Sequence, residues 1–162
     1  MPKVSEMLVQ ILTGAGVRHL FGIPSVHNIG LYDALRDEAS IQHILCRHES
    51  SATHMADGYA RAGTGPGVIM TSTGPGSGYM IPPLMEAWWS SSPVLALTTN
   101  IDTGRIGKKT GALHEVDNQA SMFREFTKKR FCPRKADAVA AMAREALAGV
   151  LSERPGPVYL EV

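Results

Sequence analysis

The sequence predicts an α/β fold in three layers (α/β/α): a doubly wound sheet of six mainly parallel strands, with helices on both faces. Short apolar segments alternate with helical patterns about six times along the 162 residues, as in parallel sheets whose strands are joined by helices. The apolar run within residues 93–99 is continuous, which is typical of a strand buried on both faces. A chain of this length suits one domain with its own core.

Three helices and three strands are expected in the first half of the chain. Apolar residues at helical spacing predict a helix over residues 3–15, and a short buried strand follows over residues 19–23. Asn28 is a suitable N-cap for a helix over residues 29–35. A strand at 41–46, a helix at 49–62 and a strand at 67–71 come next.

The second half begins with a glycine-rich turn at residues 73–78. Pro82 and Pro83 are tolerated only near the start of a helix, so the next helix is expected over residues 82–90. Residues 101–114 form a long polar loop, and loops of that length in a compact domain are often functional. The remaining elements are a strand at 93–99, a short helix at 116–124, a strand at 128–132, a helix at 136–151 and a final strand at 157–162.

Composition excludes several classes of function. A net charge of +1 and an aromatic content of 6% argue against a nucleic-acid-binding protein, which usually carries a basic stripe. Cys46 and Cys132 are the only cysteines, so a disulfide scaffold is excluded and a cytoplasmic setting is favoured. No apolar run approaches the roughly 18 residues of a membrane-spanning segment, so no membrane partner is expected.

Candidate functional residues gather where the predicted parallel strands end, because ligands of such sheets bind outside the carboxyl ends of the strands. Glu49 follows the second strand and opens a helix, whose N-terminus favours an ionised carboxylate. Position alone leaves two interpretations of Glu49: a functional carboxylate, or the more common first-turn glutamate that only stabilises its helix. The segments expected at this edge are residues 22–28, 47–50 and 72–79.

His27 and His114 stand out among the six histidines, because both fall in loops at the expected ligand edge. A zinc-protease site is excluded, because Ala52 stands where the pair at residues 48–49 requires a second histidine. The glycine turn at residues 74–78 has neither the lysine of a phosphate loop nor the spacing of a dinucleotide-binding fingerprint. On its own, this turn predicts only a tight bend before a helix.

Several of these segments, taken together, are similar to a known family. They occur in the order Phe21-Gly22-Ile23-Pro24, Arg47-His48-Glu49, residues 54–62, residues 71–76, Ser91-Ser92-Pro93 and Gly156-Pro157-Val158. In this order and spacing they resemble the N-terminal, pyrimidine-binding domain of thiamine-diphosphate enzymes of the acetolactate synthase and 2-oxo acid decarboxylase group. The resemblance extends over residues 1–162, as a single pyrimidine-binding domain, and implies the fold predicted above.

The resemblance implies that Glu49 activates the cofactor, thiamine diphosphate. In the family, the glutamate of the Arg-His-Glu motif contacts ring nitrogen N1′ of the aminopyrimidine and promotes the imino tautomer of the neighbouring amine. That amine then removes the proton from the thiazolium carbon, while the protein supplies orientation and tautomer control. Pro75 matches a residue that packs on the pyrimidine ring. The other cofactor-binding positions that the resemblance implies are Ile23, Pro24, Thr73, Gly74 and Tyr79.

His114 and His27 are the further catalytic residues that the resemblance implies. His114 falls where many synthases carry glutamine, and His27 matches a histidine that some decarboxylases and lyases place beside the substrate. Two histidines there can serve as proton relays. Two activities are therefore open: acetolactate synthase-like decarboxylation with carboligation, or simple decarboxylation of a 2-oxo acid. Tyr79 and Ser90 differ from the residues that many members of the family have at these positions. A third alternative is a non-catalytic binding domain that keeps the fold.

The resemblance also implies what other chains or domains supply. The family holds the diphosphate and its Mg²⁺ on a second domain through a Gly-Asp-Gly motif, which does not occur in these 162 residues. The central and diphosphate-binding domains are thus expected to be absent, with no metal ligand here and no activity of the isolated domain. The expected partners are a 2-oxo acid, the diphosphate-binding domain of a neighbouring chain and a second copy in a homodimer or tetramer. Trp88 or Trp89 is the expected anchor of self-association.

Overall fold

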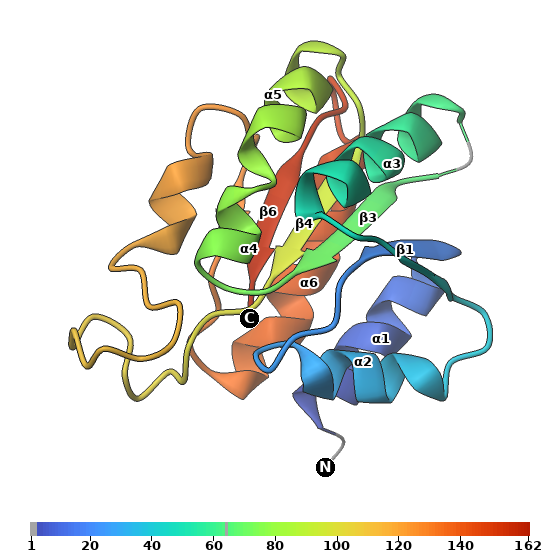
Figure 1. The fold of residues 1–162 in the computed structure, drawn as a ribbon. Coiled ribbons are helices and arrows are strands. Elements are labelled where there is room, and N and C mark those ends of the chain that lie inside the picture. The colour runs from blue at the N-terminus through green and yellow to red at the C-terminus, as the bar shows by residue number, and fades with distance from the viewer. Residues whose placement is uncertain (1–2, 64) are drawn as a thin grey trace.

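The computed structural model describes residues 3–63 and 65–162, and its centre is one six-stranded sheet with the strand order β2-β1-β3-β4-β6-β5 (Figure 1). Every neighbouring pair of strands in this sheet is parallel, which confirms the predicted parallel architecture. The strands are β1 (His19–Gly22), β2 (Gln42–Leu45), β3 (Gly67–Thr71), β4 (Val94–Thr98), β5 (Arg130–Phe131) and β6 (Val158–Glu161).

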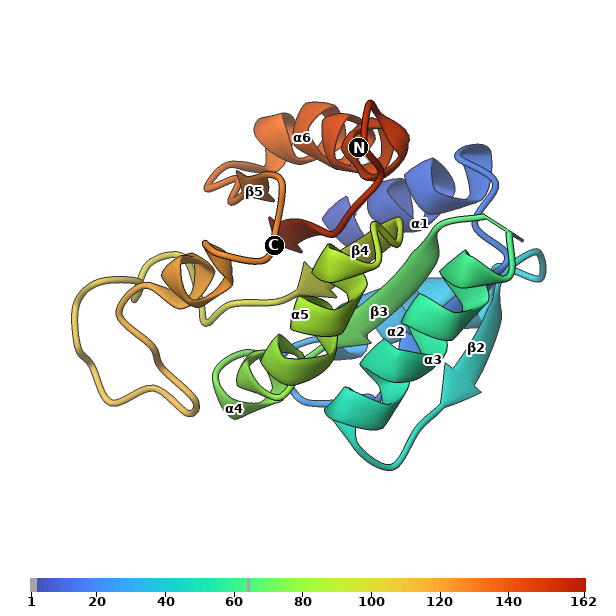
Figure 2. The same cartoon turned by 90° about the horizontal axis from the view of Figure 1, so that it is seen from above.

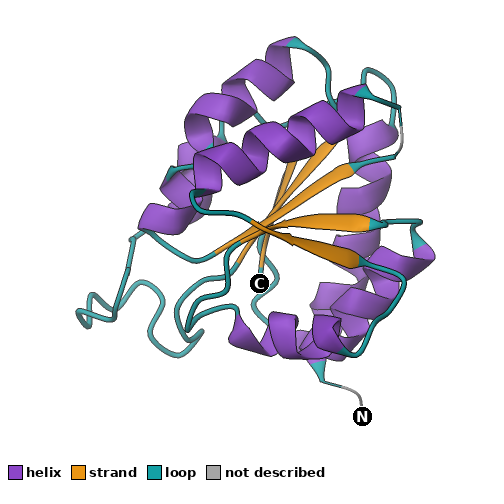
Figure 3. Cartoon of the chain, turned by 45° about the vertical axis from the view of Figure 1, so that its right-hand side comes forward, coloured by secondary structure: helices purple, strands orange, loops and turns teal. Residues whose placement is uncertain are grey.

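Helices cover both faces of the sheet, as the three-layer prediction requires (Figure 2). One face is covered by α1 (Val4–Gly14), α2 (Ile29–Arg36) and α6 (Ala136–Leu151). The other face is covered by α3 (Glu49–Arg61), the single turn α4 (Pro75–Gly78) and α5 (Ile81–Trp89). Viewed from another side, the strands fan out between these two layers (Figure 3).

The alternation of side chains along the central strands divides the core into two halves, because successive residues of a strand point to opposite faces. On β4, Leu95 and Leu97 pack in the half that faces α1 and α6, whereas Ala96 packs in the half that faces α3 and α5. All five residues of β4 are buried. The prediction of a strand buried on both faces is therefore confirmed, and the sheet is a rigid support for the loops at its ends.

Local structure departs from the sequence predictions at three points. The glycine turn includes α4, because Pro75 suits the first turn of a helix. The short helix expected at 116–124 is a 3₁₀ helix, η1 (Gln119–Phe123), whose Ser121 amide donates to the Asn118 side chain. The predicted side-chain cap of α2 is wrong: Asn28 precedes that helix but makes no capping hydrogen bond. Its side chain turns back into the preceding loop instead.

The segment between β4 and η1 is the longest stretch without a regular element, as the sequence predicts. It extends outward from the edge of the sheet at which β3 and β4 end (Figure 1). Across residues 3–63 and 65–162, no helix has both the length and the apolar character needed to cross a bilayer.

Candidate active site

Four segments meet at the carboxyl edge of the sheet. The loop after β1 supplies His27, whose Nδ1 lies 3.2 Å from the Oγ atom of Ser72, at the end of β3. The start of α3 supplies Glu49, which borders Gly76 in the turn after β3. The long loop after β4 supplies His114, which packs against Gly74 in the same turn. The structure thus brings together Glu49, His27 and His114, which the sequence analysis selected from distant positions in the chain.

Glu49 is the first residue of α3, and His48 is its N-cap, with extended backbone and a ring nitrogen that accepts from the Ser50 amide at 3.2 Å. A Cβ atom added to Gly76 would lie 3.3 Å from Glu49 Oε1, so the carboxylate faces the glycine turn. Glu49 is half-buried, and within the described residues its carboxylate has no hydrogen-bond or ion-pair partner. Half-buried carboxylates usually have such partners, so this one is available to a ligand.

The glycine turn requires glycine at two positions. Gly74 has φ +58°, and a Cβ atom there would lie 2.5 Å from the His114 carbonyl oxygen. At Gly76, a Cβ atom would lie 3.1 Å from Ser72 Cβ. Pro75, between them, is exposed at the start of α4. The two glycines therefore allow the long loop and Glu49 to approach the turn closely, and they leave the ring of Pro75 as an accessible apolar surface.

A buried polar network lies directly behind this turn and was missed by the sequence analysis. Its centre is Gln119, whose Oε1 accepts from the Gly74 amide at 2.6 Å and from the Thr73 hydroxyl at 2.8 Å. The Gln119 side-chain nitrogen, which has two hydrogens to donate, lies 3.0–3.2 Å from four acceptors: the Thr98 hydroxyl, the Thr99 carbonyl, the Tyr159 hydroxyl and Glu161 Oε2. Thr73, predicted to bind cofactor, therefore directs its hydroxyl into the core, where it supports the turn.

Glu161 anchors this network although it is fully buried. Its Oε2 accepts from Tyr159, and its Oε1 accepts from Asn100 at 2.7 Å and from Arg134 at 2.9 Å. Arg134 also supplies the compensating charge. A buried carboxylate with every oxygen bonded rigidifies its surroundings. The only sequence signal for this network was the position of Glu161 at the end of an apolar strand.

His27 and His114 face each other across the same edge, with ring centroids 5.5 Å apart and an interplanar angle of 34°. The His27 ring is half-buried, whereas the His114 ring is exposed. Burial, and then the charge of His114, lower the pKa of His27, and a hydrogen bond to the Leu113 backbone opposes this change. A neutral ring is consequently favoured at His27.

The remaining predicted residues flank this group. Ile23 is half-buried and Pro24 is exposed in the loop after β1. Buried Asn28 fixes that loop, since it accepts from the Ser25 amide at 2.6 Å and donates to the Ile23 carbonyl at 3.2 Å. Tyr79 lies at the far end of α4 and is half exposed, with its ring 4.7 Å from that of His48.

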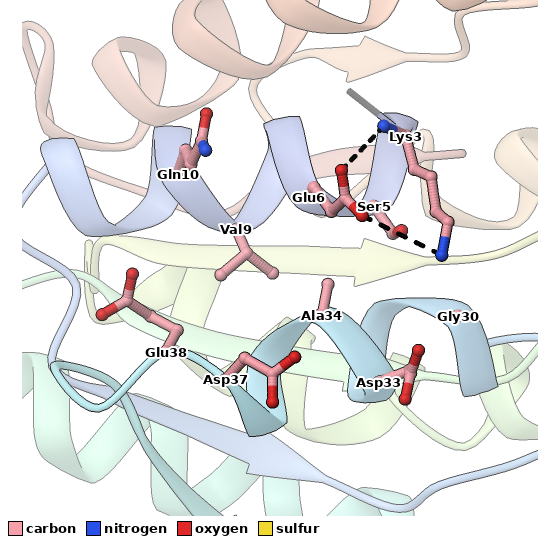
Figure 4. Close-up of a pocket in the computed structure, with 10 residues that line it drawn as sticks. All are labelled: Lys3, Ser5, Glu6, Val9, Gln10, Gly30, Asp33, Ala34, Asp37 and Glu38. Carbon is pink, nitrogen blue, oxygen red and sulfur yellow. Dashed lines mark hydrogen bonds and ion pairs between the residues drawn. The ribbon is translucent and has the colours of Figure 1, made fainter. Parts of the chain in front are cut away.

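Other parts of the surface do not combine with this edge. A groove between α1 and α2 has acidic side chains (Figure 4). However, Asp33 and Asp37 pair with Arg36, and Glu38 accepts a hydrogen bond from the Ser40 hydroxyl. No residue of the carboxyl-edge group lines that groove. Within residues 3–63 and 65–162, no three His, Cys, Asp or Glu side chains are arranged to hold a metal ion.

Comparisons with known proteins identify related sequences. Residues 2–122 match the family model described as "Thiamine pyrophosphate enzyme, N-terminal TPP binding domain". A probable acetolactate synthase large subunit of Methanocaldococcus jannaschii is 36% identical over 160 residues, which are 99% of this chain and 26% of that protein. For the acetolactate synthase isozyme 3 large subunit of Escherichia coli, the identity is 34% over 158 residues, 98% of this chain and 27% of that protein.

A relative with another activity in its name is equally similar. A probable 2-ketoarginine decarboxylase of Pseudomonas aeruginosa is 36% identical over 157 residues, which are 97% of this chain and 28% of that protein. The chain therefore spans about a quarter of the length of the curated relatives it matches. The matched family model covers both Glu49 and the two facing histidines.

Proposed function

Because this chain belongs to the thiamine pyrophosphate enzyme family, to whose N-terminal binding domain it corresponds, we propose that it is the pyrimidine-binding half of an enzyme that acts on 2-oxo acids. Glu49 activates the cofactor in this proposal. The leading activity is acetolactate synthase-like, in which decarboxylation is followed by transfer to a second carbonyl. The names of several similar proteins support this activity.

The carboxylate of Glu49 carries the proposal. It is half-buried, it faces Gly76, and it has no partner among the described residues. A carboxyl group in this position can hold or accept a proton at a ring nitrogen placed against the turn. A first-turn glutamate that only stabilises its helix would instead need no more than solvent and the helix dipole around its carboxylate. A purely helix-stabilising glutamate does not require Gly76 to lie so close to its carboxylate. The close approach therefore favours a functional role for Glu49.

The residues present fit an aminopyrimidine ring. Pro75 offers an exposed apolar surface next to Glu49, and Gly74 keeps the turn fixed through its bond to Gln119. Ile23 and Pro24 border the site from the loop after β1, and Tyr79 borders it from the end of α4. When bound, thiamine diphosphate would supply a nucleophilic thiazolium carbon and a cationic ring that can accept the electrons released by decarboxylation.

Simple decarboxylation of a 2-oxo acid is the second candidate activity. The facing pair of His27 and His114 favours it, because decarboxylation without carboligation ends with protonation of the reacting carbon. An imidazole has a pKa near neutrality, so it can give and recover that proton. The similar 2-ketoarginine decarboxylase supports this candidate. In either activity, the two histidines lie at the same edge of the sheet as the glycine turn.

The remaining parts of the enzyme belong to the proposal as well. A diphosphate-binding domain of a neighbouring chain holds the diphosphate and Mg²⁺, and a homodimer or tetramer in the cytoplasm brings the two halves together. Trp89 is 75% exposed on α5, beside the exposed Met85 on the same helix. Trp88, by contrast, is half-buried and has the Arg154 guanidinium 6.0 Å from its ring. Trp89 is therefore the anchor that we assign to contact with a second copy.

The substitution Glu49→Gln in the full-length protein tests the proposal. Glutamine keeps the shape of the side chain but cannot exchange a proton with the pyrimidine nitrogen. We expect cofactor binding to persist and hydrogen–deuterium exchange at the thiazolium carbon, followed by NMR, to slow by ~10²–10⁴-fold. Glu145→Gln, an exposed change on α6, is the matched control and should exchange at the normal rate.

Two outcomes would contradict the proposal. If Glu49→Gln exchanges the thiazolium proton as fast as the unaltered protein, Glu49 does not activate the cofactor. It is then a first-turn glutamate that only stabilises its helix. If the unaltered full-length protein binds thiamine diphosphate but exchanges no faster than the free cofactor, the chain is the non-catalytic binding domain. Titration calorimetry with cofactor and Mg²⁺ separates this second case from a simple failure to bind.

A further inference from the structure

The start of α5 leaves one backbone carbonyl without its helical donor. At this point the Leu84 amide donates to the Met80 carbonyl at 3.0 Å. The corresponding bond one residue earlier would join residue 83 to the Tyr79 carbonyl, but Pro83 has no amide hydrogen. Backbone carbonyls that lose such a partner are usually satisfied by side chains or water. Proline at position 83 thus makes the Tyr79 carbonyl available to a donor from outside the helix.

That donor is Ser50, the second residue of α3. Its hydroxyl donates to the Tyr79 carbonyl at 2.7 Å, across 29 positions of the chain. A serine or threonine within a helix often bonds its own helix instead, as Thr53 does one turn later, where its hydroxyl donates to the Glu49 carbonyl at 2.8 Å. The single hydroxyl hydrogen of Ser50 therefore joins two segments that are distant in the sequence.

Glu49 lies between two residues that contact Tyr79. Ser50 follows it and bonds the Tyr79 carbonyl, and His48 precedes it and has its ring 4.7 Å from the Tyr79 ring. Tyr79 is the C-cap of α4, the helical turn that contains Gly76. The same turn therefore contacts the chain on both sides of Glu49 and supplies the glycine that its carboxylate faces. The distance between the carboxylate and the turn consequently depends on these contacts.

An ion pair joins α3 to α5 at the end that is far from the site. Arg61, the last residue of α3, has a guanidinium nitrogen 3.1 Å from Glu86 of α5 and 2.7 Å from Asp57. The two helices lie on the same face of the sheet (Figure 2). Both the Ser50–Tyr79 hydrogen bond and the Arg61–Glu86 ion pair therefore hold α3 in place, but only the first is next to Glu49.

We propose that Ser50 is a positioning residue for Glu49, and that proline at position 83 makes this role possible because it leaves the Tyr79 carbonyl for the Ser50 hydroxyl. This inference rests on the proposed function, since it concerns the step in which Glu49 activates the cofactor. Ser50 itself exchanges no proton in that step. It fixes the start of α3, so that the carboxylate meets a ring nitrogen against the glycine turn at a set distance.

Exchange of the thiazolium proton, measured in the full-length protein with thiamine diphosphate and Mg²⁺, tests this role. A displacement of 1 Å can slow a reaction by about 10²-fold, so we expect Ser50→Ala to slow the exchange by ~10–10²-fold. Cofactor binding, measured by calorimetry, should persist. Ser50→Thr keeps the hydroxyl and should exchange close to the normal rate. If Ser50→Ala exchanges at the normal rate, the proposal is wrong.

Two controls separate positioning from a general loosening of α3. Ser51→Ala removes an exposed hydroxyl in the same helical turn, and Glu86→Gln removes the charge that pairs with Arg61. Both variants should exchange the thiazolium proton at the normal rate. Equal slowing in Glu86→Gln and Ser50→Ala would overturn the proposal, because any weakening of the contact between the two helices would then be sufficient.

The substitution Pro83→Ala separates positioning from satisfaction of the carbonyl. It supplies an amide that can donate to the Tyr79 carbonyl from within the helix. In this background, Ser50→Ala should cost less free energy of unfolding, measured by urea denaturation, than it costs in the unaltered protein. Proton exchange in the double variant should nevertheless remain as slow as in Ser50→Ala. Recovery of the exchange would overturn the proposal, since Ser50 would then only satisfy a carbonyl.

A final pair of measurements distinguishes this inference from the proposed function. Ser50→Ala should not slow the exchange further in the Glu49→Gln background, because Ser50 acts only through Glu49, and multiplying effects would contradict this. In the full-length protein without cofactor, amide hydrogen exchange over residues 48–53 and 76–80 should be faster in Ser50→Ala than in Ser51→Ala. Unchanged amide exchange refutes the positioning role. Normal thiazolium exchange in Glu49→Gln refutes the proposed function, and it is recognised separately because the amide measurement needs no cofactor.

Discussion

The glycine turn separates two polar regions of different character. Behind it, Gln119 and Glu161 lie in a network that is almost free of solvent, and every side-chain oxygen and nitrogen of these two residues has a partner. In front of it, within residues 3–63 and 65–162, the Glu49 carboxylate has no hydrogen-bond or ion-pair partner and the His114 ring has no hydrogen bond. Polar groups whose bonds are complete support a structure, whereas accessible groups with incomplete bonds are available for chemistry. The turn is the boundary between the support and the site.

The largest effect that this comparison predicts follows from Gln119→Leu. The substitution removes the acceptor of the Gly74 amide and the Thr73 hydroxyl and one donor to Glu161. Each unpaired buried group costs about 1–3 kcal/mol, so we expect a loss of at least about 3 kcal/mol in the free energy of unfolding, measured by urea denaturation. Asn118→Ala, which removes an exposed cap of η1, is the control and should cost about 1 kcal/mol. Equal losses in the two variants would show that the network is not a support.

A smaller loss is expected from Gly74→Ala. A Cβ atom at Gly74 meets the His114 carbonyl oxygen at 2.5 Å, in a backbone conformation with φ +58° that side chains disfavour. We expect the free energy of unfolding to fall by about 2–3 kcal/mol and thiazolium exchange to slow, because the turn must shift. Gly78→Ala is the matched control in the same turn, since a Cβ atom there meets nothing within 4 Å. It should change stability by less than about 1 kcal/mol, and an equal loss at both glycines would contradict the close approach.

The smallest expected effects concern the pH dependence of stability. This dependence has opposite signs in the two regions. Behind the turn, burial raises the pKa of the Cys132 thiol from 9.0 to about 11, with the charge of Glu161 as the second cause. The unfolded chain therefore loses this proton first, and stability should fall as the pH rises from 9 to 11. In front of the turn, the pKa of His27 is lowered from 6.5. The unfolded chain gains that proton first, so stability should fall as the pH drops below about 6.5.

Paired variants assign each pH limb to its region. Chemical denaturation of Cys132→Ala should show a shallower decrease in stability on the alkaline side and an unchanged acid side. His27→Gln should show a shallower decrease on the acid side, where half-buried His43 also contributes because partial burial lowers its pKa as well. The assignment is wrong if Cys132→Ala alters only the acid limb or His27→Gln only the alkaline one.

The sequence was sufficient to predict what depends on local pattern. The six parallel strands, the covering helices and the position of Glu49 after β2 follow from periodicity and from short motifs. The network around Gln119 could not be predicted in this way, because its partners Thr98 and Glu161 are brought together only by the register of β4 against β6. Asn28 shows the opposite error: a residue type that often caps helices bonds the loop before the helix instead. The polar groups near a side chain, and not its residue type alone, determine which hydrogen bonds it makes.

The strand order has a consequence for how this protein can change. The chain leaves β1 toward α2 on one face of the sheet and leaves β3 toward α4 and α5 on the other face (Figure 2). Loops that diverge in this way open a crevice between neighbouring strands, whatever their own sequences. An opening at this edge is thus favoured by connectivity, and not by the particular sequences of the segments around His27 and His114. Exchanging these two segments between relatives would therefore test whether they determine substrate preference, as the proposed function expects.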